Sequence, residues 1–145
     1  MGEGDIAKPS RTAGIALAVV ALVVAVFAVV TLLSGPVVYD EGDSEIAVSA
    51  GDRFSVRLKD DPGTGYRWVI AAPEPDPAVL RAVGSHFDSD APPGENGSGG
   101  GSRYLEFEAT GVGRTDLRLL HCLRCGTPGA VERGARSVNF RVTVR

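Results

Sequence analysis

The chain has 145 residues, of which 43% are apolar and 23% charged, and its formal net charge at pH 7 is −3. A chain of this length is expected to form one domain with a short appendage. Because the charge is slightly acidic and no segment gathers Lys and Arg, the composition excludes nucleic acid as an expected partner. Glycine (19) and proline (9) are abundant for a helical protein, which favours an all-β domain.

Residues 13–33 contain no charged side chain and consist mainly of Ala, Val, Leu and Ile. A helix of this length reaches ~30 Å at ~1.5 Å per residue, which is the thickness of a bilayer core. Core helices of soluble proteins seldom run so far without a polar face. We therefore predict a single transmembrane helix over residues 13–34, with the lipid bilayer as its partner and the cell membrane as the location.

The charges on either side of this segment predict its orientation. Lys8 and Arg11 precede it, whereas an acidic stretch follows it over residues 40–45. The positive-inside rule then makes residues 1–12 a cytoplasmic tail and the C-terminal domain extracytoplasmic. The apolar run is long for a signal peptide and ends without an Ala-x-Ala site, which favours an uncleaved signal anchor over a cleaved leader. Residues 35–44 are interpreted as an acidic tether.

Residues 45–145 show the alternation of apolar and polar side chains that is typical of half-buried strands, most regularly over residues 54–58 and 138–144. Residues 79–83 fit either a short strand or one helical turn. Residues 88–102 are mostly Gly, Pro, Ser, Asp and Asn, which predicts an exposed loop. About seven short strands separated by turn signals predict an immunoglobulin-like β-sandwich.

One stretch, residues 61–68 with the sequence Asp-Pro-Gly-Thr-Gly-Tyr-Arg-Trp, combines turn residues with the start of an aromatic strand. Pro62 fixes its own φ, whereas Gly63 and Gly65 adopt positive φ at little steric cost. Such a loop can hold a backbone conformation that other residues resist, and it can approach another surface closely. Composition alone is equally consistent with a tight turn between two strands.

The two cysteines, Cys122 and Cys125, admit several interpretations. No βαβ pattern surrounds them, which is against a redox motif, and His86 with His121 is a poor second ligand pair for zinc. An extracytoplasmic domain allows a local disulfide, which we favour over free thiols and over a metal site. In an extended strand the two residues would lie ~10 Å apart, too far to bridge. A disulfide therefore requires a turn at residues 123–124.

We find no arrangement that predicts an enzyme. Ser85 and His86 lie near Asp88, but closeness in sequence does not make a catalytic geometry. His86 is expected to be solvated, and His121 to lie at the inner end of a strand. No nucleotide-binding Gly-x-x-x-x-Gly-Lys loop is present. We therefore predict no catalytic residue, no metal and no cofactor.

The stretch 61–68 resembles the Asn-Pro-Thr-Thr-Gly-Tyr-x-Trp loop of the chagasin family of cysteine-peptidase inhibitors (family I42). The resemblance covers residues 45–145. In that family three loops at one end of a sandwich enter the cleft of papain-like peptidases. A Gly-x-Gly-Gly loop matches residues 97–100 here, but Leu-Arg-Cys at residues 123–125 replaces the family's Arg-Pro-Trp.

The resemblance implies that the outer domain is a reversible, monomeric inhibitor of papain-like cysteine peptidases. Its peptidase-binding residues would be Pro62, Gly63, Thr64, Gly65, Tyr66, Trp68, Gly97, Gly99, Gly100, Leu123 and Arg124. Loss of the family's third-loop Trp removes a large aromatic anchor. A disulfide could instead pre-organise that loop and present Arg124. The alternative is an envelope binding module that keeps the fold without inhibiting a peptidase.

Overall fold

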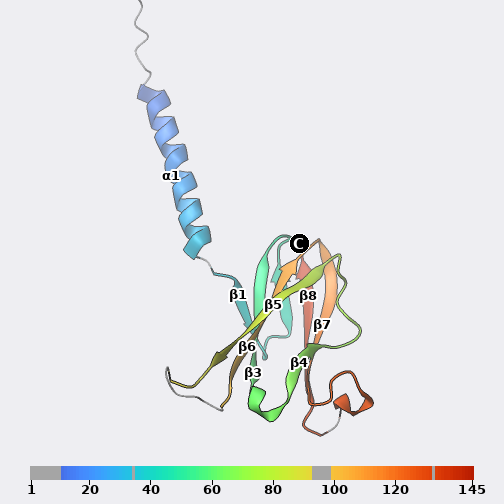
Figure 1. The fold of residues 1–145 in the computed structure, drawn as a ribbon. Helices are drawn as coiled ribbons and strands as arrows, with labels where there is room; N and C mark the ends of the chain where they lie inside the picture. Colours follow the sequence, from blue (N-terminus) through green and yellow to red (C-terminus); the bar gives the residue numbers. More distant parts are fainter. Residues whose placement is uncertain (1–10, 34, 93–98, 132) are drawn as a thin grey trace, which may run out of the picture. The chain divides into compact units, whose positions relative to one another are not determined.

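The computed structural model describes residues 11–33, 35–92, 99–131 and 133–145. Its contacts divide the chain into two compact units, Met1–Gly35 and Pro36–Arg145. The described part of the first unit is one helix, and the second is a domain of strands (Figure 1).

The helix α1 (Arg11–Leu33) covers the predicted apolar segment. Its Arg11–Val30 stretch is long and apolar enough to cross a membrane, and none of that stretch is buried. Leu17 and Phe27 are therefore 73% and 71% exposed. A helix that is apolar on every side is expected in a membrane rather than in water. By length and composition, α1 suits a membrane span and a signal sequence alike.

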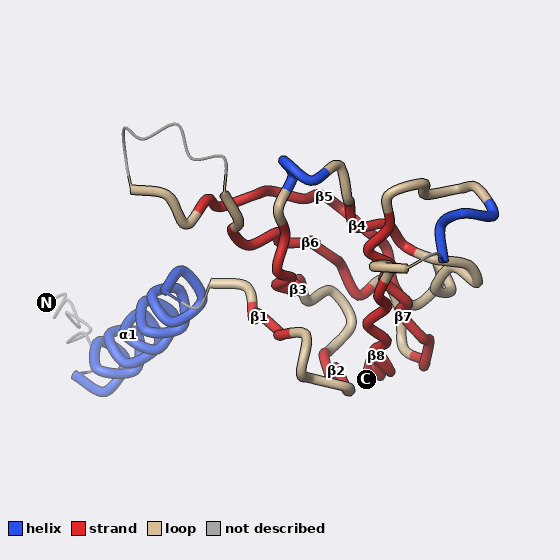
Figure 2. Tube along the Cα trace, turned by 90° about the horizontal axis from the view of Figure 1, so that it is seen from below, coloured by secondary structure: helices blue, strands red, loops and turns tan. Residues whose placement is uncertain are grey.

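The described residues of the second unit form eight strands in two sheets. The strands are β1 (Val37–Asp40), β2 (Glu45–Val48), β3 (Arg53–Asp60), β4 (Arg67–Ile70), β5 (Leu80–Ser89), β6 (Gly101–Ala109), β7 (Gly113–Cys122) and β8 (Arg136–Val144). The first sheet has the order β1-β3-β6-β5 and the second the order β2-β8-β7-β4. Two 3₁₀ turns, η1 (Pro62–Thr64) and η2 (Pro128–Val131), follow β3 and β7 (Figure 2). This arrangement confirms the predicted β-sandwich.

The segment that was expected to be a tether, residues 35–44, contains β1. This strand runs parallel to β3, with Val37 opposite Phe54 and Asp40 opposite Arg57. Tyr39 packs its ring edge-on against Phe54, at 5.7 Å between centroids. A short run of Val and Tyr, which are strong strand formers, gains a sheet edge here instead of staying in solvent. The second unit therefore begins at Pro36 rather than near Glu45, and eight strands replace the expected seven.

The strand β5 also differs from expectation, because it is ten residues long where the sequence left a short strand or a helical turn open. It pairs with β6 from Leu80 opposite Ala109 to Ser89 opposite Gly101, with one irregularity at residues 82–84. The strand therefore extends two residues into the predicted loop at 88–102. Pairing with β6 compensates for the modest β-propensity of its Gly, Ser and Asp residues.

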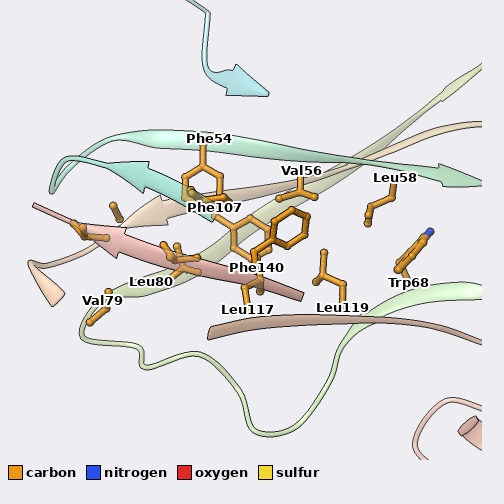
Figure 3. Packing of buried hydrophobic residues seen from close by; sticks show 14 residues of the cluster. Phe54, Val56, Leu58, Trp68, Val79, Leu80, Phe107, Leu117, Leu119 and Phe140 are labelled. Atoms are coloured by element: carbon orange, nitrogen blue, oxygen red, sulfur yellow. The ribbon is translucent and has the colours of Figure 1, made fainter. Parts of the chain in front are cut away.

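The hydrophobic core lies between the two sheets. Phe54, Val56 and Leu58 of β3 point toward Leu117 and Leu119 of β7 (Figure 3). All five side chains are at most 1% exposed. Trp68 closes the core at one end and is 9% exposed. This continuous core supports the strands whose connecting loops form the site described next.

Candidate functional site

Three connections lie at one end of the β-domain, which we call the loop end (Figure 1, lower end). They are loop 1 (residues 61–66), the described ends of loop 2 (residues 90–92 and 99–100) and the described parts of loop 3 (residues 123–131 and 133–135). The strand register brings them together. Asp60 at the end of β3 pairs with Gly101 at the start of β6, and Arg67 at the start of β4 pairs with Cys122 at the end of β7. Loop 1 crosses from one sheet to the other and therefore lies between loops 2 and 3.

Loop 1 is a 3₁₀ turn stabilised by its own polar groups. The Asp61 side chain accepts a hydrogen bond from the Gly63 N–H at 3.2 Å, and the Thr64 hydroxyl donates to the Asp61 carbonyl at 2.7 Å. The Gly65 N–H donates to the Pro62 carbonyl at 3.2 Å. Gly65 ends the turn with φ of 82°, a conformation that residues with a Cβ resist. All four residues from Pro62 to Gly65 are exposed, so the turn presents backbone to solvent.

An aromatic group holds the base of loop 1. The His121 ring of β7 lies 5.2 Å from the Tyr66 ring and 4.8 Å from the Trp68 ring, between centroids. The Trp68 indole N–H donates to the Lys59 carbonyl at 2.9 Å, which satisfies its one donor. The Tyr66 hydroxyl donates to the Arg133 carbonyl in loop 3 at 3.4 Å. Tyr66 and Trp68 thus anchor loop 1 rather than extending freely from it.

Loop 3 carries the disulfide between Cys122 and Cys125, with their Cα atoms 5.3 Å apart. The favoured interpretation of the cysteines is therefore confirmed, and the chain turns at residues 123–124 as the geometry requires. Leu123 is 52% exposed, and Arg124 is also exposed. A Cβ at Gly65 would lie 3.2 Å from Leu123 Cδ1, so loop 3 lies directly against loop 1.

We predict that changing Cys122 and Cys125 together to Ser lowers the melting temperature by only a few degrees, because the closed loop is very short. A Ser hydroxyl at position 122 could still donate its one hydrogen to the Arg67 or the Leu120 carbonyl, which the sulfur faces. Affinity for the papain-like peptidase that the resemblance implies should fall more than about tenfold, since loop 3 loses its fixed shape. Calorimetry and inhibition assays measure the two effects. Unchanged inhibition would mean that loop 3 makes no contact.

Loop 2 is described only at its ends. Gly99 and Gly100 lie at the loop end, whereas Gly97 falls outside the described residues. The Asp90 N–H donates to the Gly100 carbonyl at 3.2 Å. A Cβ at Gly101, where β6 begins, would lie 2.2 Å from the Asp88 carbonyl oxygen, so only glycine fits this crossing.

Two polar groups that the sequence did not single out support loop 1 from below. Asp60, with a side chain 2% exposed, accepts a hydrogen bond from Arg103 Nε at 3.0 Å. Its second oxygen lies 3.6 Å from His121 Nε2. The Arg136 guanidinium lies 4.9 Å from the centre of the Trp68 indole ring. Such a cation over an aromatic face is attracted to the ring.

Glu41, from the segment between β1 and β2, holds Arg136 in place. Its carboxylate accepts two hydrogen bonds from Arg136, one of them at 3.2 Å, and one from the Lys59 N–H at 2.6 Å. Burial raises the pKa of Glu41, but the hydrogen bonds from Arg136 and Lys59 outweigh it and lower the pKa below its ordinary value of 4.5. Residues that were expected to be a tether thus brace the base of loop 1.

Because the folded-state pKa of Glu41 is lowered, its carboxylate stabilises the fold above pH 4.5, and that contribution is lost as the pH falls through the folded-state pKa. We therefore predict that Glu41→Gln destabilises the domain by about 1 kcal/mol at pH 7. The difference from the parent should disappear at strongly acidic pH. Urea unfolding at several pH values measures it, with the exposed Glu74→Gln as control. A difference independent of pH would contradict this role.

The remaining candidates from the sequence do not join the loop end. His86 lies in β5, stacked on Tyr104 at 4.7 Å and with Nδ1 3.1 Å from the Glu106 carboxylate. His86 is exposed, as expected from the sequence. It also has two partners, Tyr104 and Glu106, which the sequence did not indicate. Within the described part of the chain, no three His, Cys, Asp or Glu side chains are placed to hold a metal ion.

The sequence of the β-domain matches a known family. The profile of the chagasin family peptidase inhibitors, I42, matches residues 47–144. The chain belongs to the chagasin family. Proteins of the chagasin family are peptidase inhibitors and not enzymes, which confirms the prediction that this chain is not an enzyme. No curated protein matches the chain in sequence.

Solved structures support the chagasin fold. Amebosin is 22% identical, with a TM-score of 0.57. A cysteine protease inhibitor from Entamoeba histolytica is 19% identical, with a TM-score of 0.56. In both comparisons 77% of this chain and 100% of the other chain are covered. At these identities the likeness concerns the fold. Within that fold, loop 1 and the start of β4 in this chagasin-family chain keep the pattern Pro-x-Thr-Gly-Tyr-x-Trp at residues 62–68.

Proposed function

We propose that this chain is a membrane-anchored, extracytoplasmic and reversible inhibitor of papain-like cysteine peptidases. The observation that carries the proposal is loop 1, an exposed Pro-Gly-Thr-Gly turn that a chagasin-family domain supports on the stacked rings of Tyr66, Trp68 and His121. Such a turn can enter a narrow cleft, because its glycines have no side chain to keep the backbone at a distance.

The shape of loop 1 also accounts for inhibition without cleavage. A peptidase aligns an extended substrate with its nucleophile before it attacks a carbonyl. Loop 1 is not extended, since the Thr64 N–H donates to the Asp61 carbonyl and the Gly65 N–H to the Pro62 carbonyl. Opening this turn would also disturb the packing of Tyr66 and Trp68 on His121. We infer that loop 1 occupies the cleft near the catalytic thiol and remains intact there.

Loops 2 and 3 would flank loop 1 and contact the two rims of the cleft. A stable interface buries about 800 Å² on each partner, which is more than one short turn can supply. Gly99 and Gly100 would contribute backbone on one side, and Leu123 and Arg124 side chains on the other. Exposed Leu123 would take the place of part of the family's aromatic anchor. The disulfide would reduce the ordering cost of loop 3 on binding.

The second candidate is a binding module that keeps the chagasin fold but inhibits no peptidase. The observation in its favour is Leu-Arg-Cys at residues 123–125, where the family has Arg-Pro-Trp. Under this alternative, bulky substitutions at Thr64 and Gly65 would leave partner binding unchanged. Under the first proposal they would abolish inhibition.

An assay with the fragment that begins at Pro36 tests the proposal, because this fragment includes β1 and the complete core. We expect inhibition of at least one papain-like peptidase at micromolar concentration or below, and full recovery of peptidase activity after dilution. Absence of inhibition across several such enzymes would favour the binding module. Slow cleavage of the fragment within residues 61–66 would contradict the proposed geometry.

The anchor is proposed to remain attached, with the N-terminus in the cytoplasm. The support is the apolar length of α1 and the basic residues that precede the apolar run. We predict that a reporter enzyme fused after Arg145 is active only outside the cytoplasm and stays with the membrane fraction. A reporter active in the cytoplasm would reverse the topology, and a soluble product that lacks α1 would identify a cleaved leader.

A further inference from the structure

Two buried polar atoms face each other beneath loop 1 without a hydrogen bond. They are Oδ1 of Asp60 and Nε2 of His121, and neither has a partner among the described residues. The atoms are 3.6 Å apart, which is beyond hydrogen-bond length. The side chains are 2% and 15% exposed, so solvent does little to satisfy them. Buried polar atoms without partners are uncommon in folded proteins and call for an explanation.

Chemistry requires a proton between these two atoms. A carboxylate oxygen can only accept, so His121 must carry hydrogen on Nε2 to interact favourably. An imidazolium makes a shorter and stronger hydrogen bond to a carboxylate than a neutral ring does. Histidine is also the side chain that usually gains its charge between about pH 5 and 8. Uptake of a proton by His121 would therefore draw the two side chains into hydrogen-bond contact.

His121 is packed where such a movement reaches loop 1. Its ring stacks on Tyr66 at an interplanar angle of 25° and lies against Trp68, its cross-strand neighbour. Tyr66 and Trp68 are the residues that anchor loop 1 to the domain. The His121 ring thus contacts both anchors, and a shift of this ring would act on both.

The charges around His121 come from every element packed on it. The pocket beside His121 is lined by four charged residues, Lys59, Asp60, Asp61 and Asp90. Arg103 forms an ion pair with Asp60. Arg136, which lies opposite His121 on β8, forms an ion pair with Glu41. The cations oppose a further positive charge. These groups comprise four carboxylates and three cations, so their net charge is −1. A positive charge on His121 would bring the total to zero.

We propose that Asp60 and His121 are positioning residues for loop 1, and that proton uptake by His121 makes the loop end bind its peptidase more tightly. The proposal rests on the proposed function. A loop that is already held in its bound shape loses less freedom on binding. Affinity should therefore rise when His121 takes up its proton.

The first test needs no peptidase. The chain contains only two histidines, so an NMR titration of the full chain in detergent micelles resolves both rings. The Trp68 indole and Gly65 amide signals should shift with the same midpoint as His121. His121→Gln should abolish this shift, and His86→Gln should leave it intact. Signals of loop 1 that do not move, or that follow His86, would overturn the proposal.

The second test measures inhibition constants of papain at pH 7.5 and pH 5 for the parent, His121→Gln and His86→Gln. The ratio of variant to parent at each pH cancels the titration of the peptidase itself. The His121→Gln ratio should increase about fivefold or more toward pH 5, whereas the His86→Gln ratio should stay near one. A ratio independent of pH would overturn the proposal. Absence of inhibition by the parent would instead refute the proposed function, while the NMR titration would still decide whether His121 positions loop 1.

Discussion

Replacing Gly65 with Leu is expected to weaken peptidase inhibition by at least about 100-fold, or ~2.7 kcal/mol. Gly65 has φ of 82°, and left-handed backbone costs a residue with a Cβ about 1–2 kcal/mol. The new side chain would also begin 3.2 Å from Leu123 Cδ1, so the exposed Leu123 side chain would have to move. Beyond these strains, it would stand between the backbone of loop 1 and the cleft.

Gly51 provides a matched control. Its φ is 91°, close to that of Gly65, but a Cβ there would meet no atom within 4 Å. Gly51 donates to the Ala109 carbonyl at the far end of β6, opposite the loop end. Gly51→Leu should therefore lower the free energy of unfolding by a similar amount, because its left-handed backbone is strained in the same way. It should leave inhibition unchanged. Equal losses of inhibition in the two variants would show that general destabilisation, and not loop 1, was responsible.

Replacing Trp68 with Ala is expected to destabilise the domain by about 3–5 kcal/mol. The side chain closes one end of the core, contacts His121 and Arg136, and leaves the Lys59 carbonyl without its donor when removed. Trp68→Phe keeps an aromatic ring but loses the indole N–H and part of the buried ring, so a smaller cost of about 1–3 kcal/mol is expected. Denaturant unfolding followed by circular dichroism measures both, because Trp68 is the chain's single Trp and fluorescence would be lost.

Inhibition should follow the same order, with a large loss for Trp68→Ala and a small one for Trp68→Phe. Val112→Ala serves as a control, since Val112 is 74% exposed between β6 and β7. The free energy of unfolding of the Val112→Ala variant should differ from that of the parent by less than about 0.5 kcal/mol. If the Trp68→Ala variant folded and still inhibited the peptidase as strongly as the parent, loop 1 would not depend on the anchors described above.

The strands that face the core could be predicted from the sequence because each carries its own pattern. Residues 54–58 and 138–144 alternate between apolar and polar side chains, and both lie in strands whose apolar side chains are buried, except for the half-buried Val138. The strand β1 could not be predicted in the same way. Four residues are too few to establish a period, and its stability comes from pairing with β3, which lies 17 residues further along the chain.

The site could be predicted in part. The Pro, Gly and aromatic residues of loop 1 are contiguous, so a local motif identifies them. The residues that brace loop 1 are not contiguous. Glu41 and Arg136 are 95 residues apart, and Asp60 and Arg103 are 43 apart. Charged side chains are common on any surface, so no local pattern distinguishes these pairs from solvated ones.

The central claim is that the loop end occupies the active-site cleft of a cysteine peptidase. Binding of the Pro36–Arg145 fragment to papain, before and after a small covalent inhibitor fills the papain cleft, tests this claim most directly. We predict that the fragment binds the free enzyme and that the blocked enzyme binds at least about 100-fold more weakly, a difference of ~2.7 kcal/mol. Equal binding to free and blocked enzyme would place the contact outside the cleft and contradict the account.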